Sequence, residues 1–405
     1  MKKFQVPLFL LIAAAIAGPA SKGQSVSVGA DLLLTGRLDL VSGKRVALVV
    51  NHTARTSEGA HIVDALRSRG VAVVRLFGPE HGVRGVAAAG EKVTDGVDSA
   101  TGIPVVSLYG KIQKPTREML RDVDVLLYDI QDVGARFYTY ISTMKLCMEA
   151  AAERGIPFVV LDRPNPLGGD LMDGPLLEDS LRSFVGCAPI PVVYGLTAGE
   201  LARYLLAERL LAGGVQPELV VLPLRGWKRK DRWEATGIPW IPPSPNLPTP
   251  ASAAVYPATC FFEATNLSEG RGSATPFEVV GAPFLDPVPI ITALNSLSLP
   301  GVQFDTTTFV PTGSKFKGKR CRGIVIAVTD PRTFQPLRTG LHLLREVVRR
   351  TPGATLQRRW FVRLMGSARV FEEFTAGMEV EEIISGWGGG LRDFERKRRG
   401  SLIYD

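Results

Sequence analysis

Residues 44–77 read KRVALVVNHTARTSEGAHIVDALRSRGVAVVRLF, and this stretch decides the fold. The run 44–50 has no polar residue after its first two positions, which predicts a strand buried on both faces. Residues 58–70 have helical spacing and end at a glycine, and residues 71–77 form a second apolar run. A strand, a helix and a strand in this order predict a parallel β-α-β unit.

The same alternation continues through the first half of the chain. The helix predicted at 197–213 opens with Thr197-x-x-Glu200, the pattern of a capping box. Continuous β-branched runs between amphipathic helices indicate a parallel sheet that is covered on both faces. The sequence therefore predicts a doubly wound α/β domain, with further strands at 104–109, 123–130, 157–162 and 218–223 and a further helix at 137–154.

The composition changes near residue 236. The segment TGIPWIPPSPNLPTP, residues 236–250, contains six prolines and has no apolar periodicity, as expected of a rigid crossover. Beyond it we expect a smaller α/β or α+β domain, with strands at 260–266 and 323–330, a helix start at 275–278, and helices at 333–350 and near 379–396. The predicted division is an N-terminal domain (25–235), a Pro-rich crossover (236–257) and a C-terminal domain (258–405).

The first twenty residues have the pattern of a signal peptide. Lys2 and Lys3 precede the apolar run LFLLIAAAIA, which ends in an Ala-x-Ala cleavage site at 15–17. We therefore expect an exported protein, periplasmic or secreted, whose mature chain starts near residue 18 or 21. No later apolar run is long enough for a spanning helix, so we expect no membrane anchor after removal of this segment.

The basic residues do not point to a nucleic-acid partner. The formal net charge is +8, but the basic residues are scattered, and the one dense run, WKRKDRW at 227–233, is typical of a solvated loop. Without a recognisable binding module, nucleic acid is not an expected partner.

The four cysteines, at 147, 187, 260 and 321, have no C-x-x-C spacing, and their positions predict no particular disulfide.

Cofactor motifs are missing where the fold would place them. The first strand is followed by NHTARTSEG rather than a G-x-G-x-x-G turn, which argues against a nucleotide-dependent oxidoreductase. The sequence has no P-loop and no G-x-S-x-G elbow for a serine hydrolase. It has only four histidines and no H-E-x-x-H motif, so no metal is expected. Because the nucleotide-binding motifs are missing, no organic cofactor is expected either.

Polar residues follow the predicted strands at their carboxyl ends. Asn51-His52, Asp129 and Asp162-Arg163 each come directly after an apolar run, and Glu80-His81 follows one after Gly78-Pro79. In doubly wound sheets, ligands bind beyond this edge. We therefore expect these side chains to gather at one site, where Pro79 and the neighbouring glycines constrain the loop.

Two carboxylates lie in glycine-rich loops, Glu80 in GPEHG and Glu269 in NLSEGRGS. Most loop carboxylates are merely solvated, but these two are enclosed by glycines and accompanied by His or Arg. Tyr138 and Tyr140, near a helix start, fit either the core or a sugar platform. Two carboxyl groups with tyrosines and no cofactor motif suit glycoside hydrolysis. An exported two-lobe solute-binding protein without turnover is the alternative.

Several motifs occur in an order that resembles the exo-β-N-acetylmuramidase (NamZ-like) family, formerly a domain of unknown function. They are VALVVNHTA, LFGPEHGVRG, YDIQDVGARFYTY, LDRPNPLGG and SPNLPTPASAAVYPATCFFEATNLSEGRGS, followed by PFE. The resemblance implies a Rossmann-like N-terminal domain, a smaller C-terminal domain and a cleft between them. It also implies release of N-acetylmuramic acid from the non-reducing ends of peptidoglycan fragments, with Glu80 as the favoured catalytic acid.

Such a substrate carries a lactyl carboxylate, which a bidentate Arg recognises best. Arg84, Arg136, Arg163 and Arg271 lie in the motif loops, and Arg271 and Arg163 are the leading choices. We assign catalysis to Glu80 and Glu269. We assign substrate binding to polar residues of the same segments: Asn51, His52, His81, Arg84, Asp129, Tyr138, Tyr140, Arg163, Asn246, Asn266 and Arg271.

Overall fold

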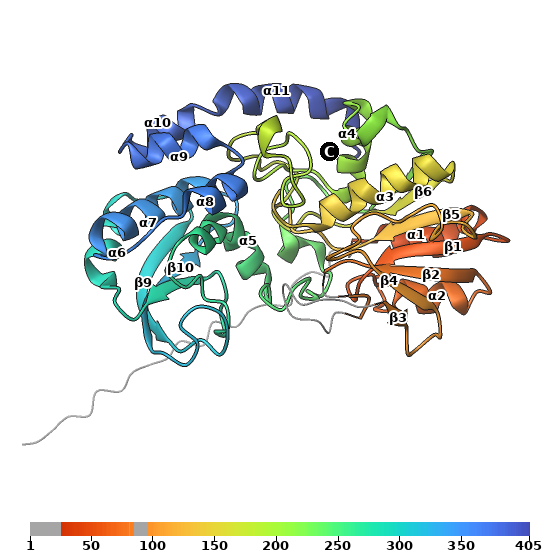
Figure 1. Cartoon of the computed structure of the whole chain (residues 1–405), viewed down its shortest axis with the longest axis horizontal. Coiled ribbons are helices and arrows are strands. Elements are labelled where there is room, and N and C mark those ends of the chain that lie inside the picture. Colours follow the sequence, from red (N-terminus) through yellow and green to blue (C-terminus); the bar gives the residue numbers. More distant parts are fainter. Residues whose placement is uncertain (1–25, 81, 85–94) are drawn as a thin grey trace, which may run out of the picture.

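Two β-sheets organise the protein, for which a computed structural model describes residues 26–80, 82–84 and 95–405 (Figure 1). The larger sheet has strand order β3-β4-β2-β1-β5-β6-β7. Only β3 is antiparallel to its neighbour, and the other pairs are parallel. Its strands are β1 (Arg45–Val50), β2 (Ala72–Gly78), β3 (Gly96–Val97), β4 (Pro104–Ser107), β5 (Val125–Asp129), β6 (Phe158–Leu161) and β7 (Leu219–Leu222).

Both faces of the larger sheet are buried, as the sequence of β1 predicts. Ala47 and Val49 point into a core formed with α3 (Tyr140–Arg154) and α4 (Ala198–Ala207). Their neighbours Val46, Leu48 and Val50 point into a second core formed with α1 (Gly29–Gly36) and α2 (Ile62–Arg67). The doubly wound prediction is confirmed, and the strand order reverses between β1 and β5, where such folds bind ligands.

The second domain is of α+β type. Its sheet, of order β8-β10-β9, is antiparallel and consists of β8 (Val279–Ala282), β9 (Val302–Phe309) and β10 (Cys321–Val328). Figure 1 shows this sheet beside its helices, at the far side of the molecule from the larger sheet. The helices are α5 (Pro250–Thr259), α6 (Pro287–Ser296), α7 (Pro336–Arg350), α8 (Arg358–Met365), α9 (Ala368–Thr375) and α10 (Val380–Ser385).

The last helix, α11 (Gly388–Arg398), leads the chain back to the first domain (Figure 1). The guanidinium of Arg398 donates to the carbonyl oxygens of Gly169 and Gly195, at 3.0 and 2.7 Å. The hydroxyl of Tyr404 donates to Asp162 at 2.5 Å. The end of the chain therefore packs against the first domain's larger sheet, although it comes after the second domain in the sequence.

Most of the predicted elements are confirmed, with ends that shift by a few residues. The capping box is also present, because the Thr197 hydroxyl accepts from the Glu200 amide and the Glu200 carboxylate accepts from the Thr197 amide. The single helix expected near 379–396 is two, α10 and α11, interrupted at Gly386-Trp387. Elements that the sequence did not predict are β3, β8, β9, α1, α5, α6, α8 and α9.

The strand predicted at 260–266 is wrong. Residues 260–264 instead form a 3-10 turn that continues α5. Thr249 caps α5 by accepting from the Ser252 amide, and proline at the first helical position suits a helix start. The aromatic residues that favour a strand are buried here against helices, so tertiary packing outweighs β-propensity.

The helix start predicted at Thr275-Pro276-x-Glu278 is also wrong, because β8 follows directly. Phe277 has a φ of 64°, which a right-handed helix does not allow. The Phe277 ring is buried, and the Glu278 carboxylate accepts from the Thr249 hydroxyl at 3.2 Å instead of capping a helix. The local capping signal is therefore overridden by burial of one aromatic side chain.

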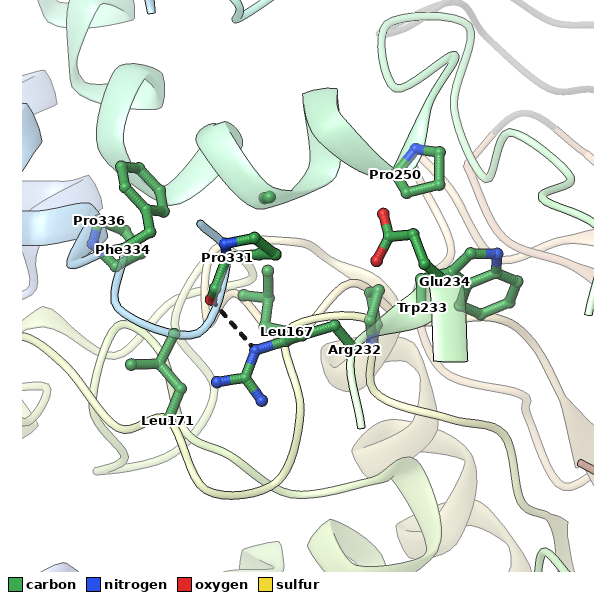
Figure 2. A pocket seen from close by; sticks show the side chains of 11 residues that line it. Leu167, Leu171, Arg232, Trp233, Glu234, Pro250, Pro331, Phe334 and Pro336 are labelled. Carbon is green, nitrogen blue, oxygen red and sulfur yellow. Dashed lines mark hydrogen bonds between the residues drawn. The ribbon is translucent and has the colours of Figure 1, made fainter. Parts of the chain in front are cut away.

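The Pro-rich crossover lies between the two domains. Figure 2 shows a small pocket there, where the Arg232 Nε donates to the carbonyl oxygen of Pro331 at 3.3 Å. Leu167 and Leu171 of the first domain and Phe334 of the second line the same pocket. Its volume, about 30 Å³, is far below the ~300–1,000 Å³ of ordinary ligand pockets, so it is a packing gap rather than a sugar site.

Arg136 links the two domains through a fully buried guanidinium. Nη1 donates to the carbonyl oxygens of Pro175 and Ile190, and Nη2 donates to those of Leu364 and Met365 at the end of α8, at 2.6–3.1 Å. Burial lowers the pKa of Arg136 to about 9. A buried cation without such acceptors would be costly, so these four bonds hold the α8 end against the first domain.

No helix among the described residues is both long and apolar enough to cross a bilayer, and the predicted signal peptide lies outside these residues. All four cysteines are free thiols, and only Cys187 is partly exposed.

We predict that Gly366→Ala destabilises the protein much more than Gly353→Ala. Both glycines have positive φ, 72° and 85°, so each alanine costs about 1–2 kcal/mol of backbone strain. A Cβ at Gly366 would also lie 2.2 Å from Nη2 of Arg136, which cannot retreat without losing its acceptors, whereas a Cβ at Gly353 meets nothing within 4 Å. Thermal unfolding of both variants measures the difference, and equal losses would contradict the role given to Arg136.

Candidate active site

A cavity of about 780 Å³ opens between the two domains. The first domain contributes Glu80 and Tyr109, and the crossover contributes Pro245 and Asn246. The second domain supplies the opposite wall. That wall consists of Glu263, Glu269, Arg271, Gly272, Gly313, Ser314, Lys315 and Trp360.

A single proline separates Glu80 from the end of β2. β2 lies beside β1, next to the place between β1 and β5 where the strand order reverses, which we call the switch point. One carboxylate oxygen accepts from the Thr139 hydroxyl at 3.3 Å, and the Glu80 carbonyl oxygen lies 3.4 Å from the Tyr140 hydroxyl. Burial raises the pKa of Tyr109 to about 12, and the charge of Glu80 and a hydrogen bond to it add to this shift. Hydroxyl groups of two loops therefore orient a half-buried carboxyl group that faces the cavity.

Glu269 lies on the loop before β8, and its side chain is almost completely buried. Its two oxygens are paired with different cations, Arg271 Nε at 3.2 Å and Lys315 Nζ at 3.1 Å. Lys315 also donates to the carbonyl oxygens of Phe262 and Leu267, at 2.8 and 2.9 Å. Glu269 is thus fixed as the centre of a charged cluster on the second domain.

Arg271 joins this cluster to the rest of the wall. Its Nη2 lies 2.6 Å from Glu263, and its guanidinium carbon is 4.9 Å from the centre of the Phe277 ring. Burial opposes the charge of Arg271, but the carboxylates of Glu263 and Glu269 outweigh burial and raise its pKa. The guanidinium is therefore a permanent cation at the surface of the cavity.

A smaller cavity of about 60 Å³ adjoins the large one and shares Glu80, Asn246 and Arg271 with it. Three aromatic rings of its lining pack together, with the Tyr256 ring edge-on to its neighbours, 5.1 Å from Phe137 and 4.7 Å from Phe277. Polar groups and aromatic rings in one lining suit a small group that carries both a charge and a methyl. The remaining lining residues are Tyr138, Thr139, Ser244 and Leu247.

The structure thus brings together some of the predicted site residues. Glu80, Glu269, Asn246 and Arg271 line the large cavity. Tyr138 lines the small one, with its ring 4.7 Å from that of Tyr140. Tyr140 is buried, and its hydroxyl donates to the carbonyl oxygen of Pro243 at 2.8 Å.

Other predicted residues lie apart from these cavities. Asp129 and Arg163 form a buried ion pair at 2.5 Å, and Arg163 lines a separate pocket of about 90 Å³ near the switch point. Arg84 pairs with Asp98 at 2.7 Å. Arg136 holds the domains together, as described above, and His81 lies outside the described residues.

Asn51, Asn266 and His52 make hydrogen bonds mostly to main-chain atoms. The side-chain oxygen of Asn51 accepts from the amide and the hydroxyl of Thr53, and the Asn266 side chain bonds to the main chain of Gly353 and Thr355. His52 Nε2 lies 2.7 Å from the carbonyl oxygen of Pro242, so it contacts the crossover.

Sequence reasoning missed Tyr109, Thr139, Glu263, Lys315 and Trp360, which line one or the other cavity. Glu263 stands in the motif FFEATN, but the strand wrongly predicted there concealed its position in the site. Nothing in the sequence around Tyr109 or Trp360 points to a site. Among the described residues, no three His, Cys, Asp or Glu side chains converge as a metal site requires.

Comparisons with known proteins agree with this architecture. Residues 46–251 match the family model for the N-terminal part of exo-beta-N-acetylmuramidase NamZ, and residues 254–404 match the model for its C-terminal part. The chain is 44% identical to the peptidoglycan beta-N-acetylmuramidase NamZ of Bacillus subtilis, and the alignment covers 98% of this chain and 97% of that protein.

Two crystal structures of DUF1343 family proteins from Bacteroides fragilis are similar to the whole fold. The first has a TM-score of 0.88 and 37% sequence identity. The second has a TM-score of 0.75 and 32% identity. Each alignment covers 94% of this chain and 99% of the other.

Proposed function

This chain belongs to the exo-β-N-acetylmuramidase family, and we propose from that premise how its cavity releases N-acetylmuramic acid from the non-reducing end of peptidoglycan fragments. The enzyme is a glycoside hydrolase. The observation that carries the assignment of roles is the cavity between the domains, where Glu80 faces the charged cluster around Glu269.

Glu80 is the proton donor in this proposal. The glycosidic oxygen leaves as an alcohol, so it must receive a proton as its bond to the sugar C1 breaks. Water then supplies the hydroxyl group at C1, and its remaining proton restores the donor. The Thr139 and Tyr109 hydroxyls orient Glu80, which reduces the reorganisation needed at the moment of transfer.

Glu269 supplies negative charge on the other side of the cavity. Positive charge develops at C1 and the ring oxygen as the bond breaks. A carboxylate fixed by Arg271 and Lys315 is already oriented for this charge and does not need to move. Both cations also keep a buried carboxylate from being left unpaired.

Arg271 recognises the lactyl carboxylate. It is the arginine among the four suggested by the sequence that lines both cavities, and the aromatic rings beside it suit the lactyl methyl. The side chains of Phe137, Tyr256 and Phe277 would exclude water from that methyl group.

We also propose that the protein is exported. Peptidoglycan lies outside the cytoplasm, and residues 1–20 have the composition of a signal peptide. The protein recovered from its host should begin near residue 18 or 21. N-terminal sequencing measures this, and recovery of a chain that starts at Met1 would contradict export.

We predict that Glu80→Gln slows hydrolysis of muraminides with poor leaving groups by about 10²–10⁴-fold, because a positioned acid contributes that much. An aryl muraminide with a very acidic phenol needs little protonation, so its bond-breaking step should slow much less. The measurement is kcat/KM over a series of leaving groups. Equal losses across the series would remove Glu80 from the proton-donor role.

We predict that Arg271→Lys weakens muramyl substrates about tenfold more than the matching glucosaminyl substrates, because lysine cannot bind a carboxylate in two places at once. Arg163→Lys is the matched control, since Arg163 is committed to Asp129 and lies outside the cavity. It should lower the melting temperature without changing the preference. If Arg163→Lys changes the preference and Arg271→Lys does not, the assignment is wrong.

A further inference from the structure

The loop between β9 and β10 carries a group of basic side chains beside the cavity. Residues 310–320 read VPTGSKFKGKR. Lys317, Lys319 and Arg320 are exposed, and the ion pairs found among the described residues include none of the three. Lys315, in the same loop, is instead committed to Glu269. We call Lys317, Lys319 and Arg320 the basic rim.

The loop that carries the basic rim is held in one conformation. The Thr312 amide donates to the carbonyl oxygen of Gly272, and the Gly318 amide donates to that of Pro311, both at 2.8 Å. The Phe316 ring lies 6.0 Å from that of Phe284. Ser314 and Phe316 have φ values of 61° and 59°, an uncommon conformation that persists only where surrounding contacts impose it.

Lys317, the first residue of the basic rim, lies close to the residues of the same loop that line the cavity. Gly313, Ser314 and Lys315 line the cavity, and the rim begins two residues later. Two residues of chain span at most about 7 Å, so the backbone of Lys317 lies within that distance of Lys315. A long lysine or arginine side chain there can reach a molecule that extends out of the cavity.

We propose that the basic rim binds the lactyl carboxylate of the second muramic acid of the glycan, counted from the non-reducing end. The first muramic acid is the one that the enzyme releases. This inference rests on the proposed function. The glycan alternates N-acetylglucosamine with N-acetylmuramic acid, so a chain whose terminal muramic acid occupies the cavity has a second lactyl carboxylate outside it. Three exposed cations that form no ion pair with another described residue complement that negative charge, and their attraction is reduced by salt.

The test compares two triple variants of equal charge change. One is Lys317→Gln/Lys319→Gln/Arg320→Gln in the basic rim. The matched control is Arg225→Gln/Lys228→Gln/Lys230→Gln, which alters exposed residues that line neither cavity. The substrates are an aryl muraminide and a tetrasaccharide that begins with N-acetylmuramic acid, with its inner lactyl carboxyl group either free or amidated.

The rim variant should lose about tenfold in kcat/KM on the free-acid tetrasaccharide, because exposed ion pairs contribute only a few-fold each. It should stay within about twofold of wild type on the amidated tetrasaccharide and on the aryl muraminide, as the control variant should on all three. Equal losses on both tetrasaccharides, no loss at all, or the same loss in the control would overturn the rim proposal alone. Failure of the unaltered enzyme to cleave the aryl muraminide would instead overturn the proposed function, and the rim proposal with it.

Discussion

The buried guanidinium of Arg136 is the interaction on which the shape of the cavity depends. It takes four main-chain carbonyl oxygens as partners, two from loops of the first domain and two from the end of α8. The same short segment continues to Tyr138, Thr139 and Tyr140, whose side chains surround Glu80 or its loop. One buried cation therefore fixes both the approach of the second domain and the backbone that orients Glu80.

The position of the site also follows from the order of the strands. The larger sheet reverses its winding between β1 and β5, and the loops that leave the carboxyl ends of its strands form one side of the cavity. This fold commonly presents a helix N-terminus to a phosphate at that point. Here the buried pair of Asp129 and Arg163 occupies the switch point, and the cavity lies farther out, against the second domain.

The sequence predicts the first domain well because its strands are continuous β-branched runs buried on both faces. The second domain was predicted poorly at 260–266 and 275–278, where burial of Phe261 and Phe277 among helices and strands overrides local propensity. Glu80 and Glu269 stood out through their glycine-rich surroundings. Sequence spacing could not distinguish Arg271 from Arg163 or Arg136, because only the packing of distant segments decides which guanidinium lines the cavity. Arg271 does so while paired with Glu263 and Glu269, whereas Arg163 and Arg136 lie elsewhere.

We propose that the cavity between the domains holds the muramyl residue, with Glu80 at the glycosidic oxygen and Arg271 at the lactyl carboxylate. The most direct measurement is a crystal structure of the Glu80→Gln variant bound to an uncleaved muramyl disaccharide. We expect the residue-80 amide within hydrogen-bond distance of the glycosidic oxygen, and the lactyl carboxylate paired with Arg271. A disaccharide bound at the switch-point pocket beside Arg163, with the cavity between the domains free of sugar, would contradict the account.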